Sequence, residues 1–185
     1  MPCTLYTSRC QPFIQAATDR PGGLELSIND LRTTLNLETQ GPLQRFLQKL
    51  LNFFGLSQTH PGCAKLTGLI QGLSAEQQIS NFLSLKSDSC VHNKDCFSMG
   101  YSEGTVHLAI QTPELALQVS IDLSPFLQLH SDQSDEELIQ RHELDIELRS
   151  LFYDESVDEA AVLNFFARHP DWCGIDNSAV KLIQI

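Results

Sequence analysis

Three residues in the middle of the chain are of the types that nucleophilic catalysis requires. Cys63 stands in the first turn of a predicted helix, where free backbone N–H groups and the helix dipole lower the pKa of a thiol. His107 and Asp122 fall on two predicted strands, on the same face by alternation. The aspartate can orient the histidine, and the histidine can take the thiol proton. The sequence thus contains one candidate catalytic triad.

The order of this triad, a cysteine at a helix start followed by His and Asp on successive strands, resembles papain-like cysteine hydrolases, including several bacterial effectors. The resemblance implies a protease or deamidase that uses Cys63, His107 and Asp122. The same residues are also explained by a core cysteine beside ordinary polar residues of a strand. We therefore keep this hydrolase as an alternative function.

Cysteines and histidines also supply ligand types that zinc prefers. His60 and Cys63 form one pair, and Cys90, His92 and Cys96 follow at short spacing. Neither group contains the Cys-x-x-Cys pair of structural zinc sites, and glycine-rich phosphate loops are absent from the sequence. We expect no metal and no cofactor, and we expect the six sparse cysteines to stay reduced.

Acidic residues are concentrated in the second half of the chain. Residues 1–94 hold eight Lys/Arg and six Asp/Glu, a net charge of +2, whereas residues 95–185 hold four and seventeen, a net charge of −13. Such acidity repels phosphate backbones, so we expect no nucleic acid and instead a protein partner with a basic surface. The candidate partner-binding residues lie on one predicted helix: Glu136, Glu137, Glu143, Asp145 and Glu147.

The N-terminal sequence and the length of the apolar runs indicate where in the cell the protein is expected. The first residues lack a basic segment followed by an apolar one, so we expect no cleaved signal peptide and a cytoplasmic location in the producing cell. No apolar run approaches the ~20 residues of a membrane helix, so we also expect no membrane-spanning segment.

Periodicity predicts most of the regular elements. Apolar spacing of three and four residues predicts helices over 27–38, 42–54, 61–71, 75–85, 135–152 and 157–168, and a last short helix around Val180, Leu182 and Ile183. Capping boxes begin at Ser74, Ser134 and Ser156. Alternation predicts a hairpin over 105–111 and 115–123, with a further strand over 96–101.

These elements predict an α+β fold, with helices packed on a small antiparallel sheet and an acidic helical C-terminal part. We divide the chain into a flexible leader or secretion signal over 1–40, an α+β core over 41–123 and an acidic helical segment over 124–185, packed on or appended to the core.

The order of features over residues 1–123 resembles the N-terminal translocation domain of type III secretion effectors of the SifA, SopD and SlrP kind. The matching segments are Met1-Pro2-Cys3-Thr4, Leu50-Leu51-Asn52-Phe53-Phe54, Cys63-Ala64-Lys65-Leu66 and Asn81-Phe82-Leu83-Ser84-Leu85. The resemblance implies a secreted bacterial effector that acts through protein–protein contact in a host cell, with Cys63 at a packing position.

A second resemblance uses the acidity and the helix–hairpin–helix order. The chain looks like class I type III secretion chaperones, which are small, acidic, cytosolic α/β dimers. A chaperone of this kind would be a stable dimer bound to its client, whereas an effector would be monomeric and would need residues 1–40 for export.

Overall fold

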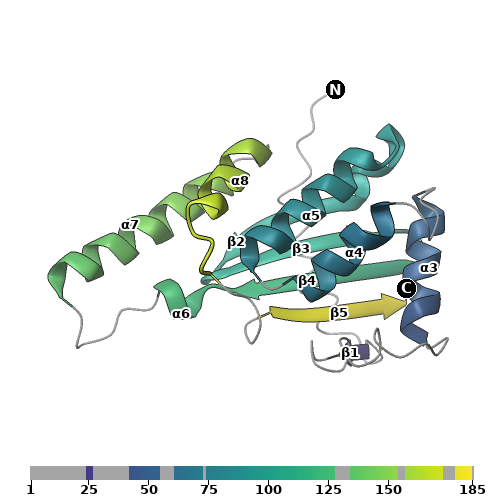
Figure 1. Ribbon diagram of the computed structural model, residues 1–185, viewed down its shortest axis with the longest axis horizontal. Coiled ribbons are helices and arrows are strands. Elements are labelled where there is room, and N and C mark those ends of the chain that lie inside the picture. Colours follow the sequence, from purple (N-terminus) through teal and green to yellow (C-terminus); the bar gives the residue numbers. More distant parts are fainter. Residues whose placement is uncertain are drawn as a thin grey trace.

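The computed structural model describes residues 24–26, 42–54, 61–72, 74–127, 134–153, 157–172 and 178–184. Its centre is a five-stranded antiparallel sheet with the strand order β1-β5-β4-β3-β2 (Figure 1). The strands are β1 (Leu24–Leu26), β2 (Phe97–Ser102), β3 (Thr105–Gln111), β4 (Leu115–Asp122) and β5 (Ser178–Gln184).

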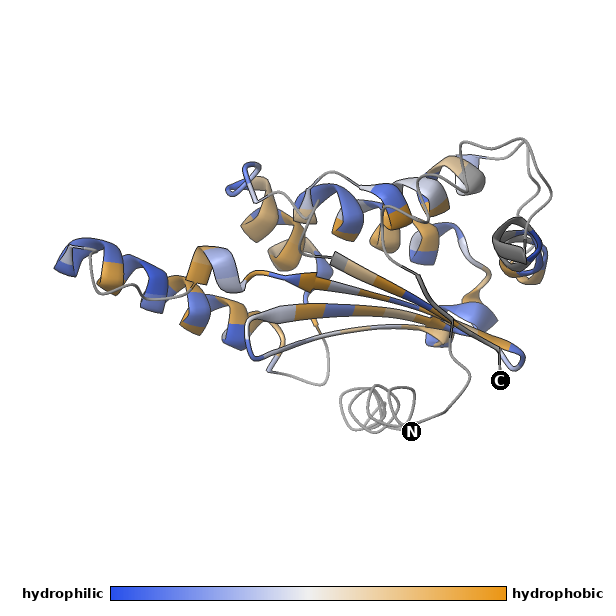
Figure 2. Ribbon diagram, turned by 90° about the horizontal axis from the view of Figure 1, so that it is seen from below, coloured by the Kyte–Doolittle hydropathy of each residue, from blue (hydrophilic) through white to orange (hydrophobic). Residues whose placement is uncertain are grey.

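Helices α4, α5 and α8 cover one face of this sheet, and α7 projects beyond the end of the strands (Figures 1 and 2). The helices are α3 (Pro42–Phe53), α4 (Pro61–Gln71), α5 (Ala75–Asp88), α6 (Ser124–Leu127), α7 (Asp135–Leu151) and α8 (Glu159–Ala167), with the 3-10 helix η1 (Val91–Cys96). The predicted α+β class, with helices packed on an antiparallel sheet, is confirmed.

The predicted hairpin is confirmed, and its alternation decides which side chains enter the core. Val106 and Leu108 on β3, with Val119 and Ile121 on β4, join the same buried cluster as the helix residues. The residues between them, including His107, point to the opposite face. Burial of one face of each strand explains the period of two in the sequence.

The turn between β2 and β3 has an unusual backbone. Glu103 and Gly104 have φ angles of 50° and 78°, the left-handed region that a two-residue hairpin turn with right-handed twist requires. Glycine adopts this region without strain, and a Cβ at Gly104 would also lie 3.0 Å from Ser124 Oγ. This turn brings the end of the hairpin beside α6.

The C-terminal segment differs from the prediction. The short helix expected around Val180 is β5, which lies inside the sheet between β4 and β1. Val180 and Leu182 are buried, and Ala179, just before Val180, points to the other face and is exposed. Seven residues are too few for periodicity to separate helix from strand, so pairing with β4 decides the outcome. The segment 124–185 therefore contributes to the sheet as well as to the acidic helices.

One piece of the predicted leader also belongs to the sheet. Residues 24–26 form β1 and pair with β5 at the edge. The remainder of the segment over 1–40, including the helix predicted over 27–38, lies outside the described residues. The polar residues 130–135 also predict a linker, of which 130–133 lie outside the described residues.

Two of the three predicted helix caps are confirmed. Ser74 accepts a hydrogen bond from the backbone of Gln77, and Ser134 and Glu137 form a complete capping box. At the third position the cap is Asp158 instead of Ser156, and its carboxylate accepts from the backbone N–H groups of the first turn of α8. A carboxylate at the N-cap satisfies these free N–H groups and also favours the helix dipole.

Candidate functional site

Helix α7 carries the residues that the sequence predicted for partner binding, and one side of it is anchored to the sheet. Leu148 is fully buried, and the Tyr101 hydroxyl on β2 donates a hydrogen bond to Asp145 Oδ1 at 2.6 Å. The rings of Tyr101 and Phe152 stack with centroids 6.1 Å apart. These contacts fix which side of α7 faces the protein and which side is left outside.

Helix α8 supports α7 from a second direction. The Arg168 guanidinium, just after α8, forms an ion pair with Glu147 on α7, and it also lies 5.3 Å from the ring centroid of Phe165. Arg149 pairs with Asp145 within α7 at 2.8 Å. The orientation of α7 thus depends on contacts to β2 and α8.

Three of the five predicted partner-binding residues are used inside the protein. Glu137 belongs to the capping box, Asp145 binds Tyr101 and Arg149, and Glu147 binds Arg168. Glu136 and Glu143 are exposed and have no partner in the described part of the chain. The free carboxylates on the outer side of α7 are therefore fewer than the sequence indicated.

Two isoleucines lie on the same outer side of α7, and sequence reasoning missed them. Ile139 is 59% exposed and Ile146 is 52% exposed, seven residues apart and therefore two helical turns along one face. Tyr153, another seven residues on and just past the helix, is 88% exposed. We name the surface made by Glu136, Ile139, Glu143 and Ile146 the α7 face.

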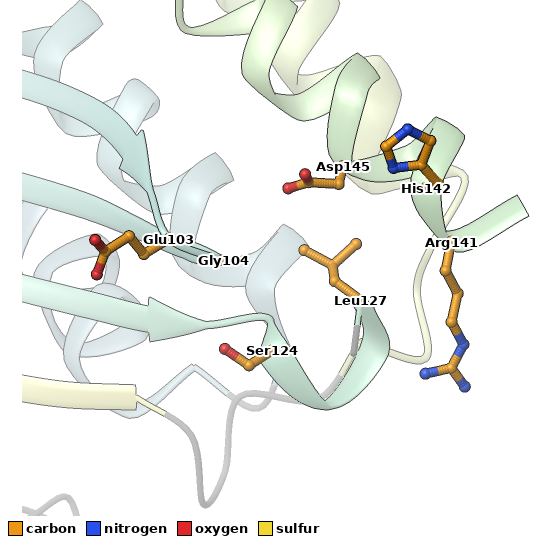
Figure 3. A pocket seen from close by; sticks show the side chains of 7 residues that line it. All are labelled: Glu103, Gly104, Ser124, Leu127, Arg141, His142 and Asp145. Carbon is orange, nitrogen blue, oxygen red and sulfur yellow. The ribbon is translucent and has the colours of Figure 1, made fainter. Parts of the chain in front are cut away.

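A pocket of about 340 Å³ lies between α7, α6 and the β2–β3 turn (Figure 3). It is lined by Glu103, Gly104, Ser124, Leu127, Arg141, His142 and Asp145. In Figure 3 the Asp145 carboxylate points toward the side of the β2–β3 turn, whereas the Arg141 side chain points away from the pocket. Because Asp145 is already bound by Tyr101 and Arg149, its charge is compensated within the protein, and we assign no ligand to this pocket.

His107 has a fully formed hydrogen-bond environment on the face of the sheet away from the helices. Its Nε2 lies 3.1 Å from Ser102 Oγ, and its Nδ1 lies 3.2 Å from Ser120 Oγ. A neutral imidazole donates through one nitrogen and accepts through the other, which suits two hydroxyl partners. Burial lowers the pKa of His107 below its usual 6.5.

The structure places two members of the predicted triad, His107 and Asp122, on one face of the sheet but not directly opposite each other. Asp122 shares a face with His107, as the alternation predicted, but it lies opposite Thr105 in the ladder and accepts a hydrogen bond from the Ser124 backbone at 2.8 Å. Cys63 belongs to α4, which covers the other face of the sheet. The Cys63 side chain lies outside the described residues, so the triad and the hydrolase remain predictions.

The cysteines and histidines considered for zinc do not gather among the residues that the structure describes. There, no group of three His, Cys, Asp or Glu side chains is arranged to hold a metal ion. Cys90 is exposed, and Cys96 is half-buried, with its thiol pKa raised by burial and by the nearby Asp95 carboxylate. His60 lies outside the described part of the chain.

Comparisons with known proteins add no relative: no family model, no curated protein and no solved structure matches the chain. Within the described ranges, none of the helices combines the length and the apolar character that crossing a bilayer needs.

Proposed function

We propose that this chain is a protein-binding module whose α7 face docks a basic amphipathic segment of a partner protein. The observation that carries the proposal is the pair Ile139 and Ile146, both more than half exposed on a helix whose opposite side is anchored. An anchored helix with an apolar stripe and free carboxylates fits the helix-in-groove or helix-on-helix modes of recognition.

Charge and apolar area have separate roles in this proposal. Burying the exposed part of each isoleucine contributes about 1 kcal/mol to binding. The carboxylates of Glu136 and Glu143 lie one turn from the isoleucines and attract Lys or Arg side chains, which supports a basic partner and speeds the encounter.

A synthetic peptide tests the proposal directly. The probe is a fluorescent amphipathic helix of Leu and Lys, compared with a scrambled peptide of the same composition and with a Leu/Glu helix. We expect the Leu/Lys helix to bind in a fluorescence-anisotropy titration. The variant I139A/I146A should bind it roughly tenfold to thirtyfold more weakly, because about 2 kcal/mol of apolar burial is lost.

Charge variants complete the test. E136K/E143K should also lose binding, whereas E114K/D171K, which changes the net charge equally at exposed positions off α7, should retain it. All three variants alter exposed side chains, so their unfolding transitions should match that of the wild type. Equal affinity of I139A/I146A and the wild type for the Leu/Lys helix would rule out the α7 face as the docking site.

The sequence resemblance supports a setting for this module, namely a bacterial type III secreted effector that acts inside a host cell. Export would depend on the N-terminal segment. Because residues 24–26 form β1, the informative deletion is 1–23, which leaves that strand in place. We expect this deletion to abolish translocation of a reporter fusion through a type III apparatus, and undiminished translocation would contradict the effector proposal.

A further inference from the structure

Helix α3 lies at the end of the molecule opposite α7 (Figure 1), and it carries a basic face. On α3, Arg45, Lys49 and Phe53 are exposed at intervals of four residues, whereas Leu50 and Phe54 on the other side are buried. The sequence of α3 contains no Asp or Glu. We name the surface made by Arg45, Lys49 and Phe53 the α3 face; it combines positive charge with an exposed aromatic ring, which is 39% exposed.

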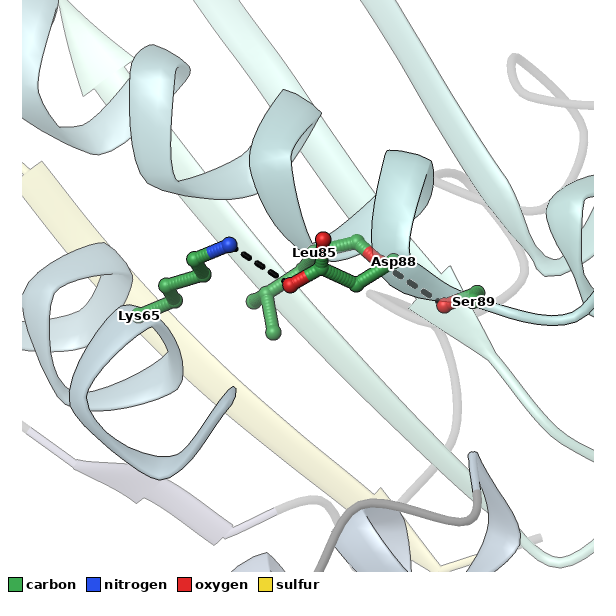
Figure 4. Close-up of polar contacts among 4 residues, drawn as sticks. All are labelled: Lys65, Leu85, Asp88 and Ser89. Carbon is green, nitrogen blue, oxygen red and sulfur yellow. Dashed lines mark hydrogen bonds and ion pairs between the residues drawn. The ribbon is translucent and has the colours of Figure 1, made fainter. Parts of the chain in front are cut away.

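The two cations of the α3 face are available for a partner, whereas two other lysines of the same half of the chain are not. Lys65 on α4 binds Asp88 on α5 at 2.6 Å (Figure 4), and Lys86 binds Glu159 at 2.6 Å. Arg45 and Lys49 form no ion pair within the described ranges.

We propose that the α7 face of one copy of this chain binds the α3 face of a second copy, head to tail. The inference rests on the proposed function, because it names a partner for the same α7 face, and it departs from the expectation that an effector-like chain is monomeric. The two faces are complementary in charge and in apolar character: free carboxylates and isoleucines on one, free cations and a phenylalanine on the other.

The spacing along the two helices also agrees. At a rise of about 1.5 Å per residue, successive residues of the α3 face are about 6 Å apart. With the helices parallel and Phe53 against Ile146, Lys49 comes level with Glu143, and Arg45 falls within side-chain reach of Glu136. Each cation then meets one free carboxylate.

Such a contact is heterologous, because it joins two different surfaces. One copy keeps a free α3 face and the other a free α7 face, so further copies can add into a ring or an open chain. The net charge of −11 opposes non-specific association. Any association that survives this repulsion therefore requires local complementarity.

Sedimentation velocity over a rising series of concentrations tests the inference on the full chain. We expect the wild type to show a concentration-dependent rise in mass. R45E/K49E and E136K/E143K should each weaken this association by about tenfold or more, because two attractive pairs become repulsive. E114K/D171K is the matched control and should not reduce association.

Mixing the two charge-reversed variants gives the decisive measurement. R45E/K49E carries two acidic faces and E136K/E143K two basic ones, so neither should associate alone, and the equimolar mixture should associate as the wild type does. This rescue also shows that both variants are folded.

Other outcomes overturn the inference. A wild type that stays monomeric, or a mixture no heavier than its components, contradicts head-to-tail binding. So does a fixed dimer that ignores all charge changes, as the chaperone-like alternative predicts. If the Leu/Lys peptide still binds the monomeric wild type, the proposed function stands and the second copy as partner is wrong.

Discussion

The His107 ring shows what the burial of a single residue does to its chemistry. Both nitrogens face serine hydroxyls, and Gly100 lies opposite the ring on β2, where it adds no side chain. Partial burial disfavours the charged imidazolium form, which is why the pKa of His107 falls. The residue types were visible in the sequence, but the serine partners depend on the ladder register.

This environment predicts a pH dependence of stability. Because the folded pKa of His107 is lower than the unfolded value of 6.5, the unfolded chain binds more protons below that pH. The stabilisation is complete above about pH 6.5 and is lost as the pH falls through the folded pKa. His169 changes the stability with pH in the same direction, because burial and the adjacent Arg168 also lower its pKa.

Urea unfolding at a series of pH values measures the effect. We expect H107Q to flatten the decline of the unfolding free energy on acidification. H142Q, at an exposed position on α7, should keep the wild-type decline. A wild-type decline that is unchanged in H107Q would show that His107 is not its source.

At the scale of the element, α7 has two apolar stripes, one that packs against the protein and one that faces outward. Leu144, Leu148 and Leu151 form the inward stripe, and Ile139 and Ile146 form the outward one. In the sequence both stripes are merely apolar residues at helical spacing. The hydrogen bond from Tyr101 to Asp145 and the ion pair from Arg168 to Glu147 decide which stripe packs inward.

Removing one anchor should therefore loosen α7 without unfolding the sheet. We expect Y101F to lower the free energy of unfolding by about 1 kcal/mol, because Asp145 loses a charge-assisted hydrogen bond in a half-buried site. Hydrogen exchange of the α7 amides should rise as well. Y153F, at an 88% exposed ring, is the control and should change neither measurement. Unchanged exchange in Y101F would mean that the other contacts of α7 suffice.

At the scale of the whole molecule, the two ends of the chain meet in one sheet. β5 pairs with β4 over seven positions and with β1 at the edge, so residues near 180 contact residues near 25 and 120. Through β5, the predicted segment 124–185 therefore shares one sheet with the predicted core over 41–123. In the sequence, the acidic helix α7 and the mostly apolar helix α8 lie between β4 and β5, two strands of the same sheet.

Adjacent positions of β5 provide a matched pair of variants. V180D puts a carboxylate into the fully buried side of the strand and should abolish cooperative thermal unfolding, because an unpaired buried charge costs several kcal/mol against a total stability of about 5–15 kcal/mol. A179D, on the exposed side, should cost about 0.5 kcal/mol or less. Circular dichroism during heating compares them. Similar losses in both variants would contradict the strand.

The sequence by itself determined that helices occupy the segments of α3, α4, α5 and α7, although α5 runs three residues beyond the predicted end at 85, and it determined the β2–β3–β4 meander, because their periodicity and caps are local. It also determined that acidity collects in the second half. Only the tertiary structure decided that the segment around Val180 is a strand, that Tyr101 binds Asp145 and Arg168 binds Glu147, and that Ile139 and Ile146 face outward. Each of these depends on contacts between residues distant in the chain, which local pattern does not encode.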